Sequence, residues 1–163
     1  MPYIRPLLAP PPSATATIGK PTSVDVFVVT ASGAQPLKAF DGIVYESELL
    51  AFVAQTADKR RHVFGWRGQD VIDDDAMATH LEQLAKEHGL ASSPAAVTIA
   101  QGRETGDFMR VVGGQLITRR DAREYFDASE AKMYTVRREL AGLFIDEVSK
   151  VRLPICVSWL AWR

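Results

Sequence analysis

The sequence predicts an α/β (α+β) domain in which helices pack on a β-sheet. Runs rich in β-branched residues, with apolar side chains two residues apart, follow a proline-rich start. After Gly68 the spacing of apolar residues changes to that of an amphipathic helix, and short strand-like runs return after Gly89. The order is three strands, a helix, a strand, a helix and a strand, which is typical of a sheet covered by helices.

The composition is that of a folded globular protein. The 163 residues are 47% hydrophobic and 24% charged, and the formal net charge is -1. We therefore expect no broad electrostatic attraction to nucleic acid. No stretch approaches the roughly 20 apolar residues that a membrane-spanning helix needs. Cys156 is the only cysteine, so a disulfide within the chain is excluded, and a reducing, cytoplasmic setting fits best.

Three regions are predicted along the chain. Residues 1–22 hold most of the nine prolines and should form an extended, disordered leader. Residues 23–125 should form the folded domain. Residues 126–163 show a second strand-like pattern, which either begins an incomplete second repeat or extends from the first domain and packs on it. The apolar C-terminal tail, which ends in "SWLAWR", would favour self-association if it were exposed.

The strands are predicted from alternation and from β-branched residues. "SVDVFVVT" (23–30) is the first strand, and "GIVYESELLAFVAQ" (42–55) is expected to be a second strand covered on both faces. "HVFGWRG" (62–68) should pair with it in a hairpin whose charged tip is 58–61. Later strands are predicted at "AAVTIA", "QLITRR", "MYTVRR" and "GLFIDEV".

Two helices are predicted from spacing and from glycine stops. Met77, Leu81, Leu84 and His88 follow the spacing of one helical face, and Gly89 is a candidate left-handed cap. A second, short helix is expected in "ETGDFMRVVGG", where the two final glycines end it.

Over roughly residues 24 to 140 these parts, in this order, resemble a gelsolin/villin repeat. The resemblance is carried by a polar turn before a buried strand, a hairpin, an aromatic-x-Gly turn, an acidic helix start, a later strand and a short helix ending in Gly-Gly. It is closest to the gelsolin-repeat proteins of fungi, which carry long proline-rich leaders. The stretches that carry it are "YESELLAFVAQTADKRRHVFGWRGQDVIDDDAMATHLEQLAKEHG" and "VTIAQGRETGDFMRVVGGQL".

The resemblance implies a fold and a function. The fold would be a mixed five-stranded sheet between one long and one short helix. The function would be non-enzymatic binding of actin in the cytoskeleton, by capping or side-binding of filaments under calcium control. A scaffold module without actin binding and a phosphoinositide-responsive regulator are the alternatives. The implied actin contact lies along the long helix, at Asp74, Met77, His80, Leu81 and Glu82.

The three consecutive aspartates Asp73, Asp74 and Asp75 have two explanations. A helix N-terminus attracts carboxylates, because its free N–H groups and dipole are positive, and each favourable contact contributes about 0.3–1 kcal/mol. The resemblance instead implies calcium, with Glu48 and Asp75 at the positions of the family's carboxylate ligands. The two carboxylates have exchanged lengths relative to the family pattern, and Ser47 stands where the family has glycine.

Two basic clusters are candidates for phosphoinositide head groups. Lys59, Arg60 and Arg61 lie at the predicted hairpin tip, and Arg119, Arg120 and Arg123 follow the last predicted strand of the domain. Solvated ends of strands would explain both clusters without a ligand. No zinc-protease spacing, phosphate-binding glycine loop or nucleophile elbow is present, so the sequence favours a protein without catalysis.

Overall fold

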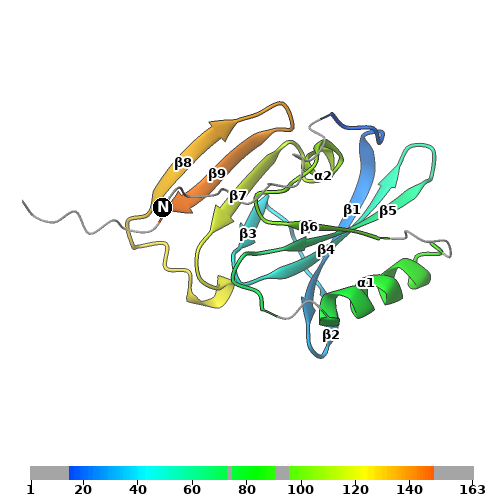
Figure 1. The fold of residues 1–163 in the computed structure, drawn as a ribbon, viewed down its shortest axis with the longest axis horizontal. Helices are drawn as coiled ribbons and strands as arrows, with labels where there is room; N and C mark the ends of the chain where they lie inside the picture. Colours follow the sequence, from blue (N-terminus) through cyan, green and yellow to red (C-terminus); the bar gives the residue numbers. More distant parts are fainter. Residues whose placement is uncertain (1–14, 73–74, 91–95, 149–163) are drawn as a thin grey trace, which may run out of the picture.

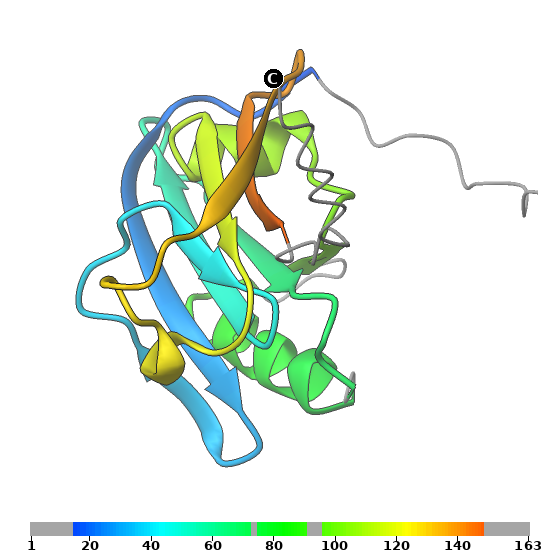
Figure 2. The same cartoon turned by 90° about the vertical axis from the view of Figure 1, so that its left-hand side faces the viewer.

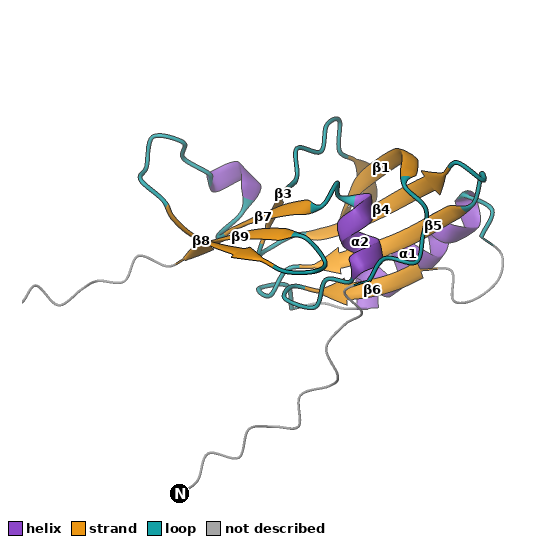
Figure 3. Cartoon of the chain, turned by 90° about the horizontal axis from the view of Figure 1, so that it is seen from above, coloured by secondary structure: helices purple, strands orange, loops and turns teal. Residues whose placement is uncertain are grey.

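The computed structural model describes residues 15–72, 75–90 and 96–148 (Figure 1). It is a mixed α+β fold with two sheets, and the described residues contain two α-helices and a short 3-10 helix (Figure 3). The elements are β1 (Pro21–Thr30), β2 (Gly33–Pro36), β3 (Ile43–Tyr45), β4 (Leu49–Thr56), β5 (Arg61–Arg67), α1 (Asp75–Glu87), β6 (Ala96–Ala100), α2 (Gly106–Val111), β7 (Gln115–Arg119), η1 (Arg123–Tyr125), β8 (Met133–Arg138) and β9 (Leu143–Val148).

The larger sheet has five strands in the order β2-β1-β4-β5-β6. Strands β2, β1, β4 and β5 pair antiparallel, while β6 runs parallel to β5, so the sheet is mixed. The central strand β4 is buried on both faces, because its apolar side chains alternate between two separate hydrophobic clusters. The prediction of a strand covered on both faces is therefore confirmed for this part of the chain.

The two helices cover opposite faces of this sheet (Figures 1 and 2). Helix α1 packs Leu81, Leu84 and Ala85 on the face formed by Leu49, Ala51 and Val53 of β4. Helix α2 packs Phe108 and Met109 on the other face, together with Leu50, Phe52 and the fully buried Trp66. Helix α1 thus buries an apolar stripe against one sheet face and leaves its other side to solvent, whereas α2 is mostly buried and only its Arg110 is exposed.

The smaller sheet has four strands in the order β3-β7-β9-β8. Strands β3, β7 and β9 are parallel, and β8 pairs antiparallel with β9. The prediction of a single strand over residues 42–55 is therefore wrong, because β3 and β4 belong to different sheets. The polar residues Glu46, Ser47 and Glu48 form the turn between them, in which Glu48 N–H donates to the Tyr45 carbonyl at 2.9 Å.

The region after residue 125 joins the fold through its strands. Strand β9 lies between β7 and β8, so residues 133–148 extend the smaller sheet instead of standing apart from it. Residues 149–163, which include Cys156 and the apolar tail, lie outside the described residues, as does most of the predicted leader. Strand β1 begins at Pro21, which is two residues earlier than predicted.

The predicted helix stops are confirmed. Gly89 has a φ of 77°, and Leu90 N–H donates to the Ala85 carbonyl at 2.8 Å, which closes the end of α1. Gly113 and Gly114 have φ values of 85° and 84° directly after α2. Within the described residues, no helix has the length and apolar character that would let it cross a membrane.

Candidate functional site

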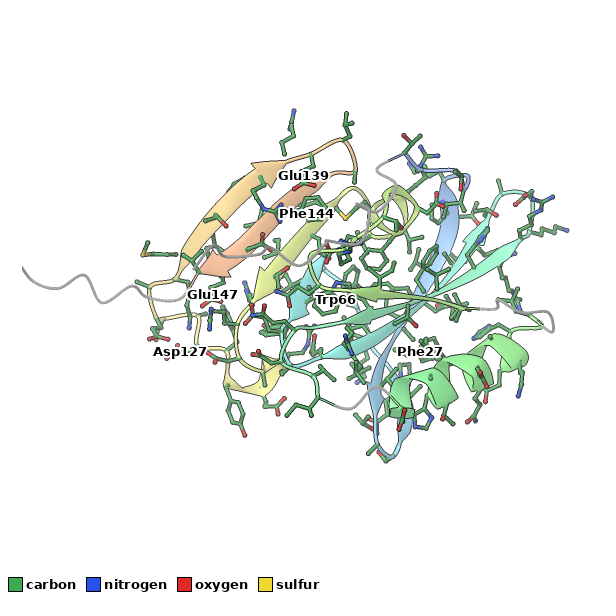
Figure 4. All side chains as sticks on the ribbon, in the orientation of Figure 1. Phe27, Trp66, Asp127, Glu139, Phe144 and Glu147 are labelled. Atoms are coloured by element: carbon green, nitrogen blue, oxygen red, sulfur yellow. The ribbon has the colours of Figure 1, made fainter. Side chains whose placement is uncertain are left out.

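Helix α1 is held on the sheet by close packing beneath it. The Leu81 side chain is 2% exposed and lies over Gly65 of β5, where a Cβ atom would come within 2.4 Å of Leu81 Cδ1. Phe27 of β1 lies on the same side of the sheet, and its ring centroid is 6.3 Å from that of His88 (Figure 4). The helix is therefore a rigid element with one buried side.

The opposite side of α1 is a continuous polar surface, which we call the α1 outer face. Thr79 Oγ1 donates to the Asp75 carbonyl at 3.1 Å, and Gln83 Nε2 donates to Glu87 Oε1 at 3.0 Å. The surface carries three carboxylates and one ammonium group, so its charge is negative. Its exposed residues are Asp75, Ala78, Thr79, Glu82, Gln83, Lys86 and Glu87.

The residues that the resemblance implies for actin binding differ in their exposure to solvent. Glu82 is exposed on the α1 outer face, and His80 is half-buried. Leu81 is a correction, because its side chain is buried against the sheet and cannot reach a partner. Asp74 and the side chain of Met77 lie outside the described residues. Thr79, Gln83 and Lys86, which the resemblance does not single out, are also exposed on this face, as their positions between the apolar residues of the helix predict.

Glu48, one of the two residues predicted to bind calcium, is 9% exposed and is paired with an arginine. Arg123 Nε donates to Glu48 Oε1 at 2.7 Å, and Arg123 NH2 donates to Glu48 Oε2 at 3.1 Å. Glu48 Oε2 also accepts from the backbone N–H of Tyr45 at 3.2 Å. Both carboxylate oxygens therefore have donors, and the negative charge has a cationic partner.

Arg123 is itself held from several sides. Its NH2 group also donates to the Ile43 carbonyl at 3.1 Å, and its guanidinium lies 4.7 Å from the centroid of the Tyr45 ring. Burial acts to lower the pKa of Arg123, but the hydrogen bonds and the charge of Glu48 outweigh it and raise that pKa above its ordinary value. The guanidinium is therefore a permanent positive charge at this turn.

The neighbouring arginines are also engaged within the protein. The Arg119 guanidinium lies 3.7 Å from the centroid of the Phe126 ring. Arg120 Nε lies 4.0 Å from Glu46 Oε2. Glu46 is 5% exposed, and its Oε2 atom accepts no hydrogen bond from the residues that the structure describes. Arg119 and Arg123 are thus held within the protein near the β3–β4 turn, whereas the Arg120 side chain is 40% exposed.

These contacts do not fit Glu48 as a calcium ligand. Calcium requires six to eight oxygen ligands at about 2.3–2.6 Å, whereas the two oxygens of Glu48 face guanidinium nitrogens and a backbone N–H. The second predicted ligand, Asp75, is the first residue of α1, where its carboxylate complements the helix N-terminus. The described part of the chain contains no group of three or more His, Cys, Asp or Glu side chains that could hold a metal ion.

Lys59, Arg60 and Arg61, the residues predicted to bind phosphoinositide, lie at the β4–β5 hairpin tip, as expected. Arg60 Nε lies 3.3 Å from Asp58 Oδ2, and Arg61 NH1 donates to the His88 carbonyl at 2.9 Å. A hydrogen bond from the Thr56 hydroxyl lowers the pKa of Asp58, which keeps this carboxylate charged beside Arg60. Lys59 is exposed, with a φ of 63°. Two of the three cations therefore have partners within the protein.

Comparison with known protein families gives one match, to a family model described as "Domain of unknown function (DUF7904)", over residues 30–120. The matched segment is more than half of the chain. The chain belongs to this family. No curated protein matches the chain.

The DUF7904 segment runs from Thr30, the last residue of β1, to Arg120, one residue after strand β7 of the smaller sheet. It contains the α1 outer face, the hairpin tip and Glu48. Arg123, the partner of Glu48, lies just beyond it, as do β8 and β9. The ion pair at the β3–β4 turn therefore joins the DUF7904 segment to the residues that follow it.

Proposed function

We propose that this chain is a gelsolin-like actin-binding module that caps filaments or binds their sides and has no catalytic role. One observation carries the proposal: the mixed five-stranded sheet has the long helix α1 on one face and the short helix α2 on the other. This is the arrangement that the resemblance to the gelsolin/villin repeat implies. A cytoplasmic, cytoskeletal location belongs to the same proposal.

The α1 outer face is the proposed contact with actin. Its thirteen-residue helix is fixed to the sheet by Leu81, Leu84 and Ala85, so the exposed residues keep their relative positions without a partner. A surface that is ordered before binding loses less conformational entropy when a partner docks. Glu82 and Gln83 lie near the middle of the helix and are the proposed centre of the contact.

Co-sedimentation with filamentous actin tests the proposal. We expect the wild-type chain to pellet with filaments and the variant Glu82→Arg to pellet less, because the charge at the centre of the contact is reversed. The matched control is Glu139→Arg, which makes the same change at the β8–β9 hairpin, away from α1 (Figure 4). Thermal unfolding of both variants checks that they are folded.

The alternative is a scaffold module with the same fold and no affinity for actin. A wild-type chain that does not pellet with filaments, in calcium or in chelator, rejects the actin proposal and favours the scaffold. Equal loss of pelleting in Glu82→Arg and Glu139→Arg would place the contact elsewhere than on the α1 outer face.

A further inference from the structure

The smaller sheet carries a continuous row of β-branched side chains, which we call the aliphatic row. The strand register aligns one such residue from each strand, in the order Ile43 of β3, Ile117 of β7, Ile145 of β9 and Val136 of β8. Residues that are partners in register point to the same face of a sheet. The aliphatic row therefore crosses all four strands on one face.

This face is turned away from the hydrophobic core. The sequence neighbours Val44, Leu116 and Phe144 point to the other face, where they belong to the cluster that includes helix α2. The members of the aliphatic row belong to neither of the two hydrophobic clusters that the described residues form. The three isoleucines are half-buried, and Val136 is 65% exposed. A continuous apolar row that is left open in this way marks a surface for a further segment or partner.

An aromatic contact closes one side of the row. The next two partners on the same face are Tyr45 of β3 and Arg119 of β7. The centroid of the Phe126 ring lies 6.3 Å from that of Tyr45 and 3.7 Å from Arg119 Cζ. The loop after β7 therefore forms a wall along the aliphatic row, and the four β-branched side chains form the floor beside it.

The sequence that follows β9 has the pattern of a strand with one apolar side. In "LPICVSW" (153–159) a large apolar residue occupies every second position, and the stretch contains no charged residue. The large apolar residues are Leu153, Ile155, Val157 and Trp159. Such alternation favours a segment that buries one side against an apolar surface.

The chain leaves the smaller sheet within reach of the aliphatic row. Strand β9 ends at Val148, three positions after Ile145 and hence about 10 Å from the row. A layer packed on a sheet lies about 10 Å above it, so the connection must span roughly 14 Å, which the five steps from 148 to 153 can do. The row itself crosses three strand spacings, about 14 Å, and residues 153–159 extend over about 20 Å.

We propose that residues 153–159, which lie outside the described residues, cross the aliphatic row and cover it with their large apolar side chains. The apolar tail, which would favour self-association if it were exposed, is then buried within its own chain. Pro154 suits this position, because a segment that crosses a sheet face donates no hydrogen bond to a strand ladder. The inference is independent of actin binding, because the smaller sheet and α1 lie on opposite sides of the molecule (Figure 1).

Thermal unfolding of the full chain tests the inference. Val157→Asp places a charge on the side that faces the row, and the matched control Ser158→Asp places the same charge on the other side. We expect Val157→Asp to lower the Tm by about 3–8 °C, because the burial of an apolar side chain is lost, and Ser158→Asp to leave it nearly unchanged. Val136→Asp should lower the Tm by a similar amount.

The double variant of Val136 and Val157 decides whether the two positions share a contact. Either charge alone removes the segment from the row, so the double variant should unfold only slightly below the less stable single variant. Met133 is 58% exposed at the start of β8, on the opposite face from Val136. Met133→Asp is therefore the control for the pair, and its effect should add to that of Val157→Asp.

Three results would overturn the inference. The first is a Val157→Asp variant with the Tm of Ser158→Asp. The second is additive effects of Val136→Asp and Val157→Asp. The third is a wild-type chain that sediments as a dimer and becomes a monomer in Val157→Asp, which would give the row to a second copy. If Val136→Asp does not fold, Val136→Ser takes its place with the same expected pattern.

Discussion

Arg123 Nε lies 2.7 Å from Glu48 Oε1, although 75 positions separate the two residues in the sequence. The pair joins the turn between β3 and β4 to the loop that follows β7. Since β3 and β4 belong to different sheets, the pair fixes the point at which the chain passes from one sheet to the other.

Removal of Arg123 should therefore lower the free energy of unfolding by more than the loss of a surface ion pair would. We expect Arg123→Ala to lower the free energy of unfolding by about 3 kcal/mol, because a buried Glu48 is left without its cation. Urea denaturation of Arg123→Ala, Glu48→Gln and the double variant measures the coupling between the two side chains. Additive effects of the two substitutions would show that the pair does not act as a unit.

The approach of Gly68 to the same turn allows a second prediction. A Cβ atom at Gly68 would lie 2.1 Å from the backbone oxygen of Glu46, and backbone cannot move aside as a flexible side chain can. Gly68→Ala should cost about 3 kcal/mol or more, and Gly65→Ala, which meets the end of the Leu81 side chain, about 1–2 kcal/mol. Gly19→Ala is the control, since its nearest neighbour would be 3.9 Å away. Equal Tm values for Gly68→Ala and Gly19→Ala would contradict the packing described at this turn.

The sequence predicts those parts of the fold whose causes are local. Gly89 ends α1 because the cap needs a left-handed residue, and β4 is recognised from its apolar run. Leu81 shows a conflict between two kinds of inference: helical spacing placed it on the apolar side, whereas the resemblance placed it in the partner contact. The structure agrees with the spacing.

The features that could not be predicted from the sequence depend on contacts between residues that are far apart in the chain. The break between β3 and β4 depends on Glu46, Ser47 and Glu48, whose polar partners are Gln101 and residues 120–123. Strand β2 lacks apolar alternation and forms as the second arm of a hairpin with β1. Arg123 has no local sequence signal that links it to Glu48, so the candidate calcium site could not be judged without the fold.

Asp107 at the start of α2 should make stability depend on pH in acid. Its carboxylate accepts from the Thr17 N–H, from Thr17 Oγ1 at 2.8 Å and from the Ile18 N–H at 2.9 Å. Burial acts to raise the pKa of Asp107, but these hydrogen bonds outweigh it and lower that pKa below its ordinary value of 3.8. The contribution to stability is therefore complete above the ordinary value and is lost as the pH falls through the lower value in the folded state.

The variant Asp107→Asn isolates this contribution. We expect it to be less stable than wild type at neutral pH, and we expect the difference to shrink as the pH falls below about 4. Urea denaturation over a pH series measures both. A difference that stays constant into acid would show that Asp107 does not favour its charged form in the folded state.

The buried indole of Trp66 provides a further prediction. Trp66 Nε1 donates to Glu104 Oε1 at 3.0 Å, and the same oxygen accepts from Gly102 N–H at 3.0 Å. Glu104→Ala should cost about 1–3 kcal/mol, because it leaves a buried donor without an acceptor. Glu104→Gln keeps a carbonyl oxygen and should cost less. Chemical denaturation followed by circular dichroism compares the two, and a larger loss in Glu104→Gln than in Glu104→Ala would contradict this reasoning.

The most direct test of the proposed function is site-specific photo-crosslinking to filamentous actin. A photoreactive amino acid that replaces Gln83 lies on the α1 outer face. In the control, the photoreactive amino acid replaces Val136 on the exposed strand β8 of the other sheet. The account predicts a covalent product with actin from position 83 and none from position 136. A product from position 136 alone, or from neither position with a chain that is folded, would contradict actin binding through α1.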